Sequence, residues 1–187
     1  MRIKGMSEPE QVLFTSATIW ALSDGLLGPL FAVFAQGIGG DILSVTWAWA
    51  LFLAITGIGM MFTGRLGDRY GHHALSVWGY IICAVFTFGY VFVVDQWGLL
   101  FVQLGLGVGL ALCNPTWDAL YDKYSGEGDN DGWLWGTASA GRYIAQAFAV
   151  VIGGLIVTYA SFTVLFTIMG CIMTLAACVQ SRILKYR

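Results

Sequence analysis

Long apolar stretches alternate with short polar breaks along the whole chain. If the breaks are loops, six apolar segments remain, each with the roughly 20 residues that a membrane-spanning helix needs. The segments cover residues 11–36, 43–64, 74–94, 97–120, 133–158 and 162–181. This pattern predicts an all-α, polytopic membrane protein in which residues 1–187 form a single six-helix transmembrane domain.

Basic residues gather on one side of these segments. The connections at residues 37–41, 95–96 and 159–161 contain no lysine or arginine. The other connections and the two ends contain Arg2, Lys4, Arg65, Arg69, Lys123, Arg182, Lys185 and Arg187. Because basic loops stay on the cytoplasmic side, both termini are predicted to lie in the cytoplasm, in a multi-pass protein of the plasma (inner) membrane.

Composition supports the bilayer as the solvent and narrows the chemistry. Apolar residues make up 58% of the chain and charged residues 11%, whereas soluble domains average about half and about a quarter. The net charge of −2 and the absence of a basic run argue against a nucleic-acid partner. The sequence has no HExxH or GxSxG motif and no cluster of metal ligands within a span. We therefore expect no enzyme activity, catalytic residue, metal site or cofactor, with a proton as the candidate coupling ion.

A short proline motif recurs at comparable depth in two spans. Gly28-Pro29 lies in the first predicted span and Asn114-Pro115 in the fourth. Three spans followed by three more, with a proline-broken helix at matching places, is the pattern of a 3+3 inverted repeat in transporter bundles. The sequence thus predicts such a repeat.

The loop between the second and third spans carries the most specific motif. Residues 64–73 read G-R-L-G-D-R-Y-G-H-H. This resembles the major facilitator signature G-x-L-x-D-R-x-G-R-R/K, and it falls in the loop where that family places it. We expect tight turns at Gly64 and Gly71 to hold Asp68 and Arg69 at the edge of the bilayer.

The resemblance implies that this loop acts as a latch. In the family its aspartate faces a helix N-terminus of the other half of the transporter, and its basic residues engage nearby acids. Asp118 and Asp122, at the end of the fourth span, are the acids expected here. His72 and His73 replace the usual basic pair, which implies a weaker latch, or one sensitive to pH near a histidine pKa of about 6.5. The alternative is that all of these are ordinary juxtamembrane charges.

The chain resembles half of a family member, because major facilitator transporters have twelve helices in two similar halves. The halves are related by a pseudo-twofold axis along the membrane normal, so two copies of one half are able to occupy both places. The resemblance therefore implies a second copy of the chain as partner, in a parallel homodimer. A heterodimer with another half, or a fragment of a longer chain, remains open.

Two charged residues lie deep within spans, Asp24 in the first and Arg142 in the fifth. Charges are expensive in hydrocarbon, so such residues normally face the protein interior or water and indicate a functional path. Asp24 is the candidate proton carrier. Arg142 either binds substrate or neutralises Asp24. In the alternative without a functional role, Arg142 or the backbone holds the Asp24 carboxylate in a static contact.

The remaining candidates suit two kinds of solute. If Asp24 and Arg142 pair, the polar and aromatic residues left to line a cavity suit a sugar. If Asp24 is unpaired, its carboxylate and the aromatic faces suit a lipophilic cation. These further candidates are Trp20, Gln103, Asn114, Trp117, Tyr121 and Gln146. The plain alternative for the two tryptophans is packing or contact with lipid.

The function we predict is secondary active transport of a small solute by alternating access. We favour a sugar or similar polar solute, because the candidate residues combine amides with flat aromatic faces. Symport with a proton is favoured over antiport, because the fourth span lacks the arginine and the fifth span the Gly-Pro pair typical of the family's antiporters. The first alternative is a multidrug exporter of lipophilic cations. The alternative from another class is a membrane scaffold, or a subunit of a hetero-oligomeric complex, that transports nothing.

Overall fold

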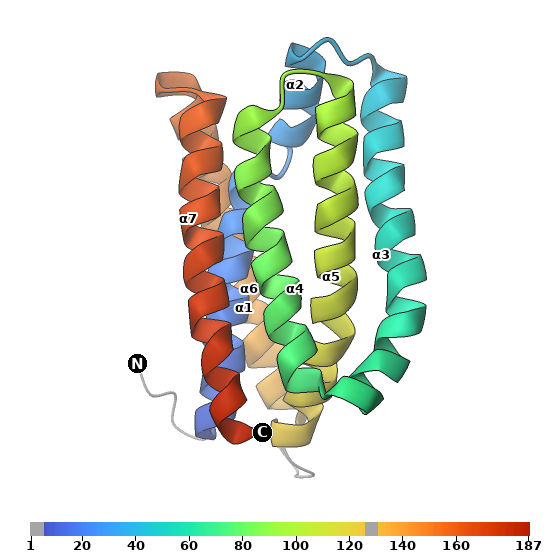
Figure 1. The fold of residues 1–187 in the computed structure, drawn as a ribbon. Helices are drawn as coiled ribbons and strands as arrows, with labels where there is room; N and C mark the ends of the chain where they lie inside the picture. The colour runs from blue at the N-terminus through green and yellow to red at the C-terminus, as the bar shows by residue number, and fades with distance from the viewer. Residues whose placement is uncertain (1–5, 126–130) are drawn as a thin grey trace.

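A computed structural model describes residues 6–125 and 131–187, except for the side chains of residues 131–134 and 138. Arg2, Lys4 and residues 126–130 of the polar linker lie outside the described residues. The described chain forms a bundle of long helices and contains no strand (Figure 1). Its elements are α1 (Glu8–Leu27), α2 (Leu30–Gly37), α3 (Ile42–Tyr70), α4 (His72–Gly89), η1 (Tyr90–Phe92), α5 (Gln96–Ser125), α6 (Asp131–Tyr159), α7 (Phe162–Gln180) and η2 (Ser181–Tyr186).

The bundle matches the predicted all-α membrane fold. Within the described ranges, α3, α4 with η1, α5, α6, and α7 with η2 are each long and apolar enough to cross a bilayer. The pair α1 and α2 passes the same test together and bends by 49° at Gly28-Pro29. Counting this bent pair as one span gives six, and the chain is a multi-pass membrane protein.

Polar residues fix the starts of α1 and α3. Ser7 caps α1, because its hydroxyl oxygen accepts a hydrogen bond from the Glu10 backbone N–H at 3.4 Å. In return, the Ser7 backbone N–H donates to the Glu10 carboxylate. Asp41 caps α3 through the Ser44 backbone N–H at 2.7 Å. Hydrogen bonds from the Ser44 hydroxyl and backbone also lower the pKa of Asp41. These caps explain why the helices begin where the apolar stretches meet the loops.

Two local predictions from the sequence are wrong. The turn expected at Gly64 is absent, because α3 continues through it to Tyr70 and the chain turns at Gly71, where φ is +92°. The break expected at Pro115 is also absent, because α5 runs through this residue. The Thr116 hydroxyl donates to the Leu112 carbonyl at 2.6 Å and so supports the turn that contains the proline.

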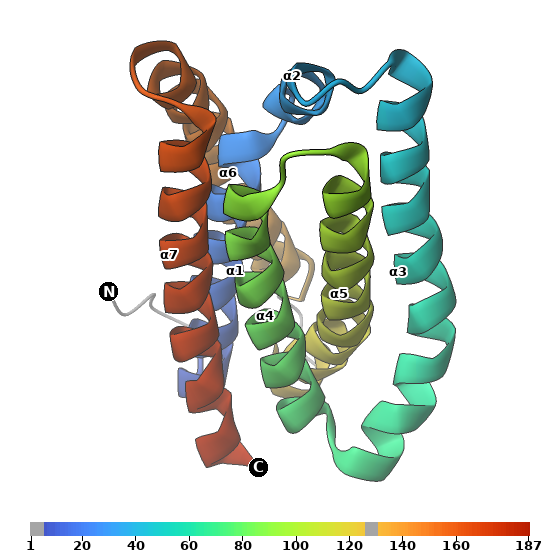
Figure 2. The same ribbon diagram turned by 45° about the horizontal axis from the view of Figure 1, so that its top comes forward.

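The packing of the helices shows the predicted 3+3 repeat. The close interhelix contacts are made mainly by the pairs α1–α6, α1–α7, α3–α5, α4–α5 and α4–α7. Exchanging α1 with α5, α3 with α6 and α4 with α7 converts this set of pairs into itself, as an internal repeat of three spans requires. Figure 2 shows α4 beside α5, and α1 beside α7.

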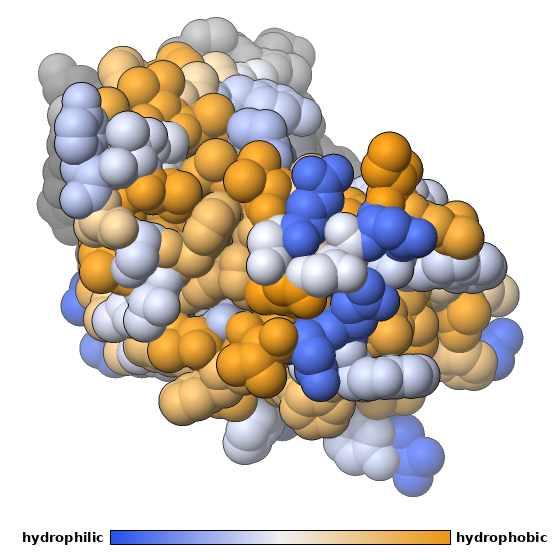
Figure 3. Space-filling model, turned by 90° about the horizontal axis from the view of Figure 1, so that it is seen from above, coloured by the Kyte–Doolittle hydropathy of each residue, from blue (hydrophilic) through white to orange (hydrophobic). Residues whose placement is uncertain are grey.

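The two ends of the bundle differ in charge. The beginning of α1 and the end of η2 lie at one end, which we call the inner end, and α2 lies at the other, the outer end (Figure 1). Seen from the outer end, hydrophilic residues gather in one area of an otherwise mixed surface (Figure 3). The loops at this end provide the acidic residues Asp41 and Asp95 and no lysine or arginine. Arg65, Arg69 and Lys123 lie in the inner half.

Helices α3 and α6 are the least covered of the spans. In the most apolar stretch of α3 11% of the residues are buried, and in that of α6 17%, against 39–50% in the other three long spans. Large apolar side chains such as Met61 and Phe62 on α3 and Phe148 on α6 are mostly exposed. These two helices therefore carry the broadest apolar surfaces open to lipid or to another protein.

Candidate functional site

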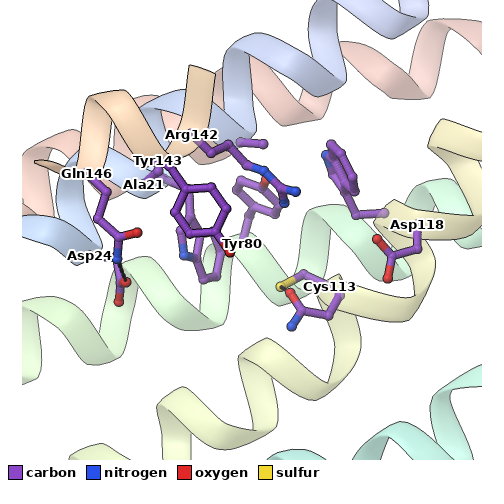
Figure 4. Close-up of a pocket in the computed structure, with 12 residues that line it drawn as sticks. Ala21, Asp24, Tyr80, Cys113, Asp118, Arg142, Tyr143 and Gln146 are labelled. Carbon is purple, nitrogen blue, oxygen red and sulfur yellow. Dashed lines mark hydrogen bonds between the residues drawn. The ribbon is translucent and has the colours of Figure 1, made fainter. Parts of the chain in front are cut away.

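A polar cavity opens between α1, α4, α5 and α6 in the inner half of the bundle. This inner cavity has a volume of about 360 Å³. Figure 4 shows its side chains converging from these helices. They are Ala17, Trp20, Ala21, Asp24, Tyr80, Cys113, Asn114, Trp117, Asp118, Arg142, Tyr143 and Gln146. Two carboxylates and one guanidinium line this space, so its fixed charge sums to −1 when all three are ionised.

A larger and more apolar cavity lies on the outer side of Asp24. This outer cavity has a volume of about 610 Å³. It is lined by Trp20, Ser23, Asp24, Leu27, Gly28, Pro29, Phe31, Trp49, Phe52, Cys83, Thr87, Tyr90, Gln103, Leu106, Leu110, Gln146, Met169 and Met173. The break between α1 and α2 at Gly28-Pro29 forms part of its wall. Carbon and sulfur atoms dominate this wall, which suits a hydrophobic ligand.

The two cavities share three residues, Trp20, Asp24 and Gln146. The Asp24 carboxylate is exposed to this space and accepts a hydrogen bond from Gln146 Nε2 at 3.0 Å (Figure 4). Trp20 stacks edge-on against Tyr80, with ring centroids 4.7 Å apart. A carboxylate and an indole ring thus both line the boundary at which a polar space meets an apolar one.

Close packing of α1 against α6 brings Gln146 to Asp24. A Cβ atom at Gly25 would lie 2.7 Å from the Gln146 backbone oxygen and 2.9 Å from the Ala149 Cβ. Only glycine fits at so short a separation, and Ala149 opposite is also small. The glycine that follows Asp24 in the sequence therefore sets the distance between the two helices at the site.

Arg142 does not neutralise Asp24 in this structure, because these two described residues form no ion pair with each other. The Arg142 guanidinium lies over the Trp117 ring, 5.1 Å from its centroid, and donates to the Ser139 hydroxyl at 3.4 Å. In Figure 4, Arg142 lies between Asp24 and Asp118 in the row of labelled side chains. The static Asp24–Arg142 pair that the sequence left open is not formed.

The structure brings most of the candidate residues together. Asp24, Arg142, Trp20, Asn114, Trp117 and Gln146 line the inner cavity, and Gln103 lines the outer one. Tyr121 lines neither, because it is fully buried and stacks on Trp117 with centroids 4.9 Å apart. It supports the wall from behind.

Several lining residues were not singled out from the sequence. Tyr80 and Tyr143 in the inner cavity, and Trp49 and Met169 in the outer one, sit in spans that are apolar on every face, so no periodicity shows which of them point inward. Asp118 was assigned to the latch but lines the inner cavity. Its place one residue after Trp117 was the available signal. Among the described residues, no group of three His, Cys, Asp or Glu is arranged to hold a metal.

The loop with the signature motif is held together mainly by its own residues. His72 Nε2 lies 3.5 Å from Asp68 Oδ1, and Arg69 lies over the Tyr70 ring at 5.5 Å. Arg69 forms no ion pair with Asp118 or Asp122 within the described ranges, and Gly64 has open space around it. The contact of Asp68 with another half of a transporter stays a prediction.

His73 is tied to the C-terminal segment. Its Nε2 lies 2.8 Å from the Tyr124 hydroxyl, which donates to the Tyr186 carbonyl at 2.8 Å. Because Tyr124 has a single hydroxyl hydrogen, His73 Nε2 must be the donor in the first bond. The second histidine of the motif therefore fastens α4 to α5 and η2.

Comparisons with known proteins agree with this architecture. A family model described as Major Facilitator Superfamily matches residues 13–184. A curated relative, the multidrug resistance protein MdtG of Serratia proteamaculans (strain 568), is 26% identical over 106 residues. That alignment covers 54% of this chain and 26% of the relative, so this chain accounts for a minor part of the relative's length.

Proposed function

Because the chain belongs to the major facilitator superfamily, a family of transporters, we propose that it transports lipophilic cations and that Asp24 receives their positive charge. The observation that carries this proposal is the state of Asp24. Its carboxylate is exposed at the junction of the two cavities and is bonded to a neutral amide rather than to Arg142. When it is ionised, a carboxylate held in this way is available to a cationic ligand.

The surroundings of Asp24 suit a cation with an apolar body. Trp20 lines both cavities together with Asp24, and cations bind the faces of such rings through the quadrupole of the ring. The outer cavity, at about 610 Å³, lies in the range of pockets that hold drug-sized ligands. The printed name of the relative, a multidrug resistance protein, supports the same class of solute.

A sugar, which the sequence favoured, has less support. That preference depended on Arg142 satisfying Asp24 and leaving neutral hydrogen-bonding groups to bind the solute. With Arg142 on Trp117 instead, Asp24 has no ion-pair partner among the described residues, and the outer cavity is largely apolar. The coupling ion in the proposal is a proton, with Asp24 as its carrier, so that proton and cation compete for one carboxylate.

Transport by alternating access needs a second bundle, and we propose that a second copy of the chain supplies it. Both α3 and α6 contribute residues to the cavity walls, and their broad apolar surfaces are suited to pack against such a partner. A parallel homodimer would close the cavity between two identical halves. Both termini would then lie in the cytoplasm, as the distribution of basic residues predicts.

The mass of the protein in nanodiscs tests the dimer. Native mass spectrometry at several concentrations is expected to show a species of twice 20.3 kDa. Disulfide crosslinks between single cysteines placed on the exposed faces of α3 and α6 should form across that dimer. A monomer at every concentration would contradict the homodimer and favour a heterodimeric partner.

Binding of tetraphenylphosphonium tests the proposed solute class. The wild type is expected to bind this ion and to carry it into proteoliposomes, and Asp24→Asn should weaken binding by at least about tenfold, as expected for a hydrogen-bonded charge. The matched control is Asp41→Asn, which removes an exposed carboxylate at the outer end and keeps a residue able to cap α3. Uptake of a hexose that survives Asp24→Asn, with no cation binding, would favour the sugar. Absence of any flux from a folded protein would favour the scaffold.

A further inference from the structure

One buried amide in the wall of the outer cavity uses only half of its hydrogen-bonding capacity. Gln103, on α5, is 1% exposed, and its Oε1 accepts a hydrogen bond from the Tyr90 hydroxyl at 3.3 Å. Its Nε2 has no hydrogen-bond partner among the residues that the structure describes. Both residues line the outer cavity.

An unpaired buried N–H group is costly, so most such groups in native proteins have a partner. In the described part of the chain two other buried side-chain atoms lack a partner, Glu10 Oε1 and His72 Nδ1, and neither residue lines the inner or the outer cavity. Gln103 is thus the one of the three that a ligand in these cavities is able to satisfy.

The rest of the outer wall offers little to a polar atom. Beyond Asp24 and Gln146 at the boundary, its polar side chains are those of Ser23, Cys83, Thr87, Tyr90 and Gln103, and the others are mainly Leu, Phe, Trp and Met. The Ser23 hydroxyl is already used, since it donates to the Met169 carbonyl at 3.0 Å. A ligand group that reaches this region therefore finds the Gln103 amide as a donor within an apolar surround, where a hydrogen bond is strong.

We propose that the outer cavity is a specificity subsite in which the Gln103 amide donates a hydrogen bond to a neutral acceptor on the apolar arm of the bound cation. The acceptor is a carbonyl or ether oxygen separated from the charge by an apolar segment, because Gln103 and Asp24 lie on different helices, α5 and α1. Tyr90 holds the amide in place by occupying its carbonyl side. Gln103 thus distinguishes among cations that Asp24 binds equally well.

This inference rests on the proposed function, because Asp24 anchors the ligand in both. It adds a chemical requirement to the solute class. A ligand arm that carries an acceptor forms a hydrogen bond with the free Gln103 N–H, whereas an arm of pure hydrocarbon leaves this N–H unpaired. An arm that carries only a donor places its own donor against the Gln103 N–H, so neither donor is satisfied. Discrimination of this kind comes from the cost of leaving a buried polar group unsatisfied.

The test uses two matched series of quaternary ammonium ions, so that ligand charge does not vary with pH. In one series a trimethylammonium group is linked by alkyl chains of increasing length to a 4-acetylphenyl group. In the other the same chains end in a 4-isopropenylphenyl group, which has the same shape but no oxygen. Affinities are measured with the purified full chain in nanodiscs by isothermal titration calorimetry.

For the wild type we expect one chain length at which the acetyl ligand binds about fivefold more tightly than its isopropenyl counterpart, the effect of one neutral hydrogen bond. In Gln103→Leu this preference should disappear, while the isopropenyl ligand keeps or improves its affinity. Because Gln103→Leu leaves the Tyr90 hydroxyl unpaired, the double variant Gln103→Leu/Tyr90→Phe, which removes both polar partners, provides a second folded form in which the preference should also be lost.

The two proposals fail in different ways. If both series bind in an Asp24-dependent manner but the wild type shows no acetyl preference at any chain length, or the variants retain it, the Gln103 subsite is wrong and the cation site stands. If no member of either series binds in a way that Asp24→Asn weakens, the proposed function fails and the subsite fails with it.

Discussion

The inner and outer cavities meet at Asp24 but bring different chemistry to it. The inner cavity has two carboxylates, one guanidinium and an asparagine in about 360 Å³. The outer one is larger, about 610 Å³, and beyond the shared residues its polar side chains are few and neutral. A fixed charge is therefore offered at one end of the space, and a hydrophobic volume at the other.

This contrast teaches how one binding space handles charge and shape separately. The inner cavity selects for ligand charge, because Asp24, Asp118 and Arg142 determine the electrostatic field there. The outer cavity selects for ligand shape, because Phe31, Phe52 and the methionines form a deformable wall. Changes in the inner cavity should thus act on all cations alike. Changes in the outer one should act on some cations and spare others.

The largest effect on stability and cation binding is expected at the crossing of α1 and α6, where the two cavities meet. Gly25→Ala places a Cβ atom 2.7 Å from the Gln146 backbone oxygen, so α6 must move and Gln146 is displaced from Asp24. We expect a loss of about 1–3 kcal/mol in stability, as for other overpacked sites. Thermal unfolding in detergent and tetraphenylphosphonium binding both report it. Gly154→Ala, on α6 in open space, is the control that should change neither.

Removal of the inner positive charge is expected to strengthen the binding of every cation. Arg142→Gln deletes the guanidinium that lies over Trp117, and both the loss of repulsion and the freed ring favour a cationic ligand. The gain should be about 1 kcal/mol, or roughly fivefold in affinity. Arg142→Lys keeps the charge and should leave affinity near the wild-type value. A weaker cation complex in Arg142→Gln would mean that Arg142 holds the site in shape rather than opposing the ligand.

A change in the outer wall should instead depend on the size of the ligand. Phe52→Leu removes part of an aromatic surface, so tetraphenylphosphonium should bind about threefold less tightly while tetramethylammonium is unaffected. Phe101→Leu, at an exposed position on α5, is the matched control. Equal losses of affinity for the two ions would show that the outer cavity does not select for ligand size, and the proposed distinction between the two cavities would then be wrong.

The smallest effect is expected at the inner mouth. Asp118 is exposed, so Asp118→Asn should weaken cation binding by only about twofold, and less at high salt, where exposed charges are screened. Titration of tetraphenylphosphonium at low and high ionic strength measures it. Asp122→Asn, also exposed on α5 but outside the cavity, should show no change at either. An Asp118 effect as large as that of Asp24 would move the main cation site inward.

The sequence predicted the membrane fold because length and hydropathy alone determine it, and it predicted the approximate site because deep charges such as Asp24 and Arg142 are rare in spans. It did not predict which partner Asp24 takes. The spans are apolar on nearly every face, so nothing in the pattern shows that Gln146, rather than Arg142, faces the carboxylate across the α1–α6 crossing.

Local features at the span ends were the least predictable. Gly64 was expected to turn because it is one of the two glycines of the signature motif that bracket its charged residues, yet charged residues also form stable helix where a span reaches water, and α3 runs on to Tyr70. Asp118 was expected at the latch because it lies at the end of the fourth span, and the sequence carries no signal for the direction of a side chain at a span end. The unpaired amide of Gln103 depends on the position of Tyr90 on another helix, which only the fold determines.

The exchange of packing partners between the two repeats has a consequence for biosynthesis. Each of the first three spans packs mainly against spans of the second repeat, and contacts within a repeat are few. As the chain leaves the ribosome, α1, α3 and α4 must therefore wait in the bilayer without their neighbours until α5, α6 and α7 are inserted. During that interval Asp24 has no Gln146 beside it, so the translocation machinery or lipid headgroups must shelter the carboxylate until the last helices arrive.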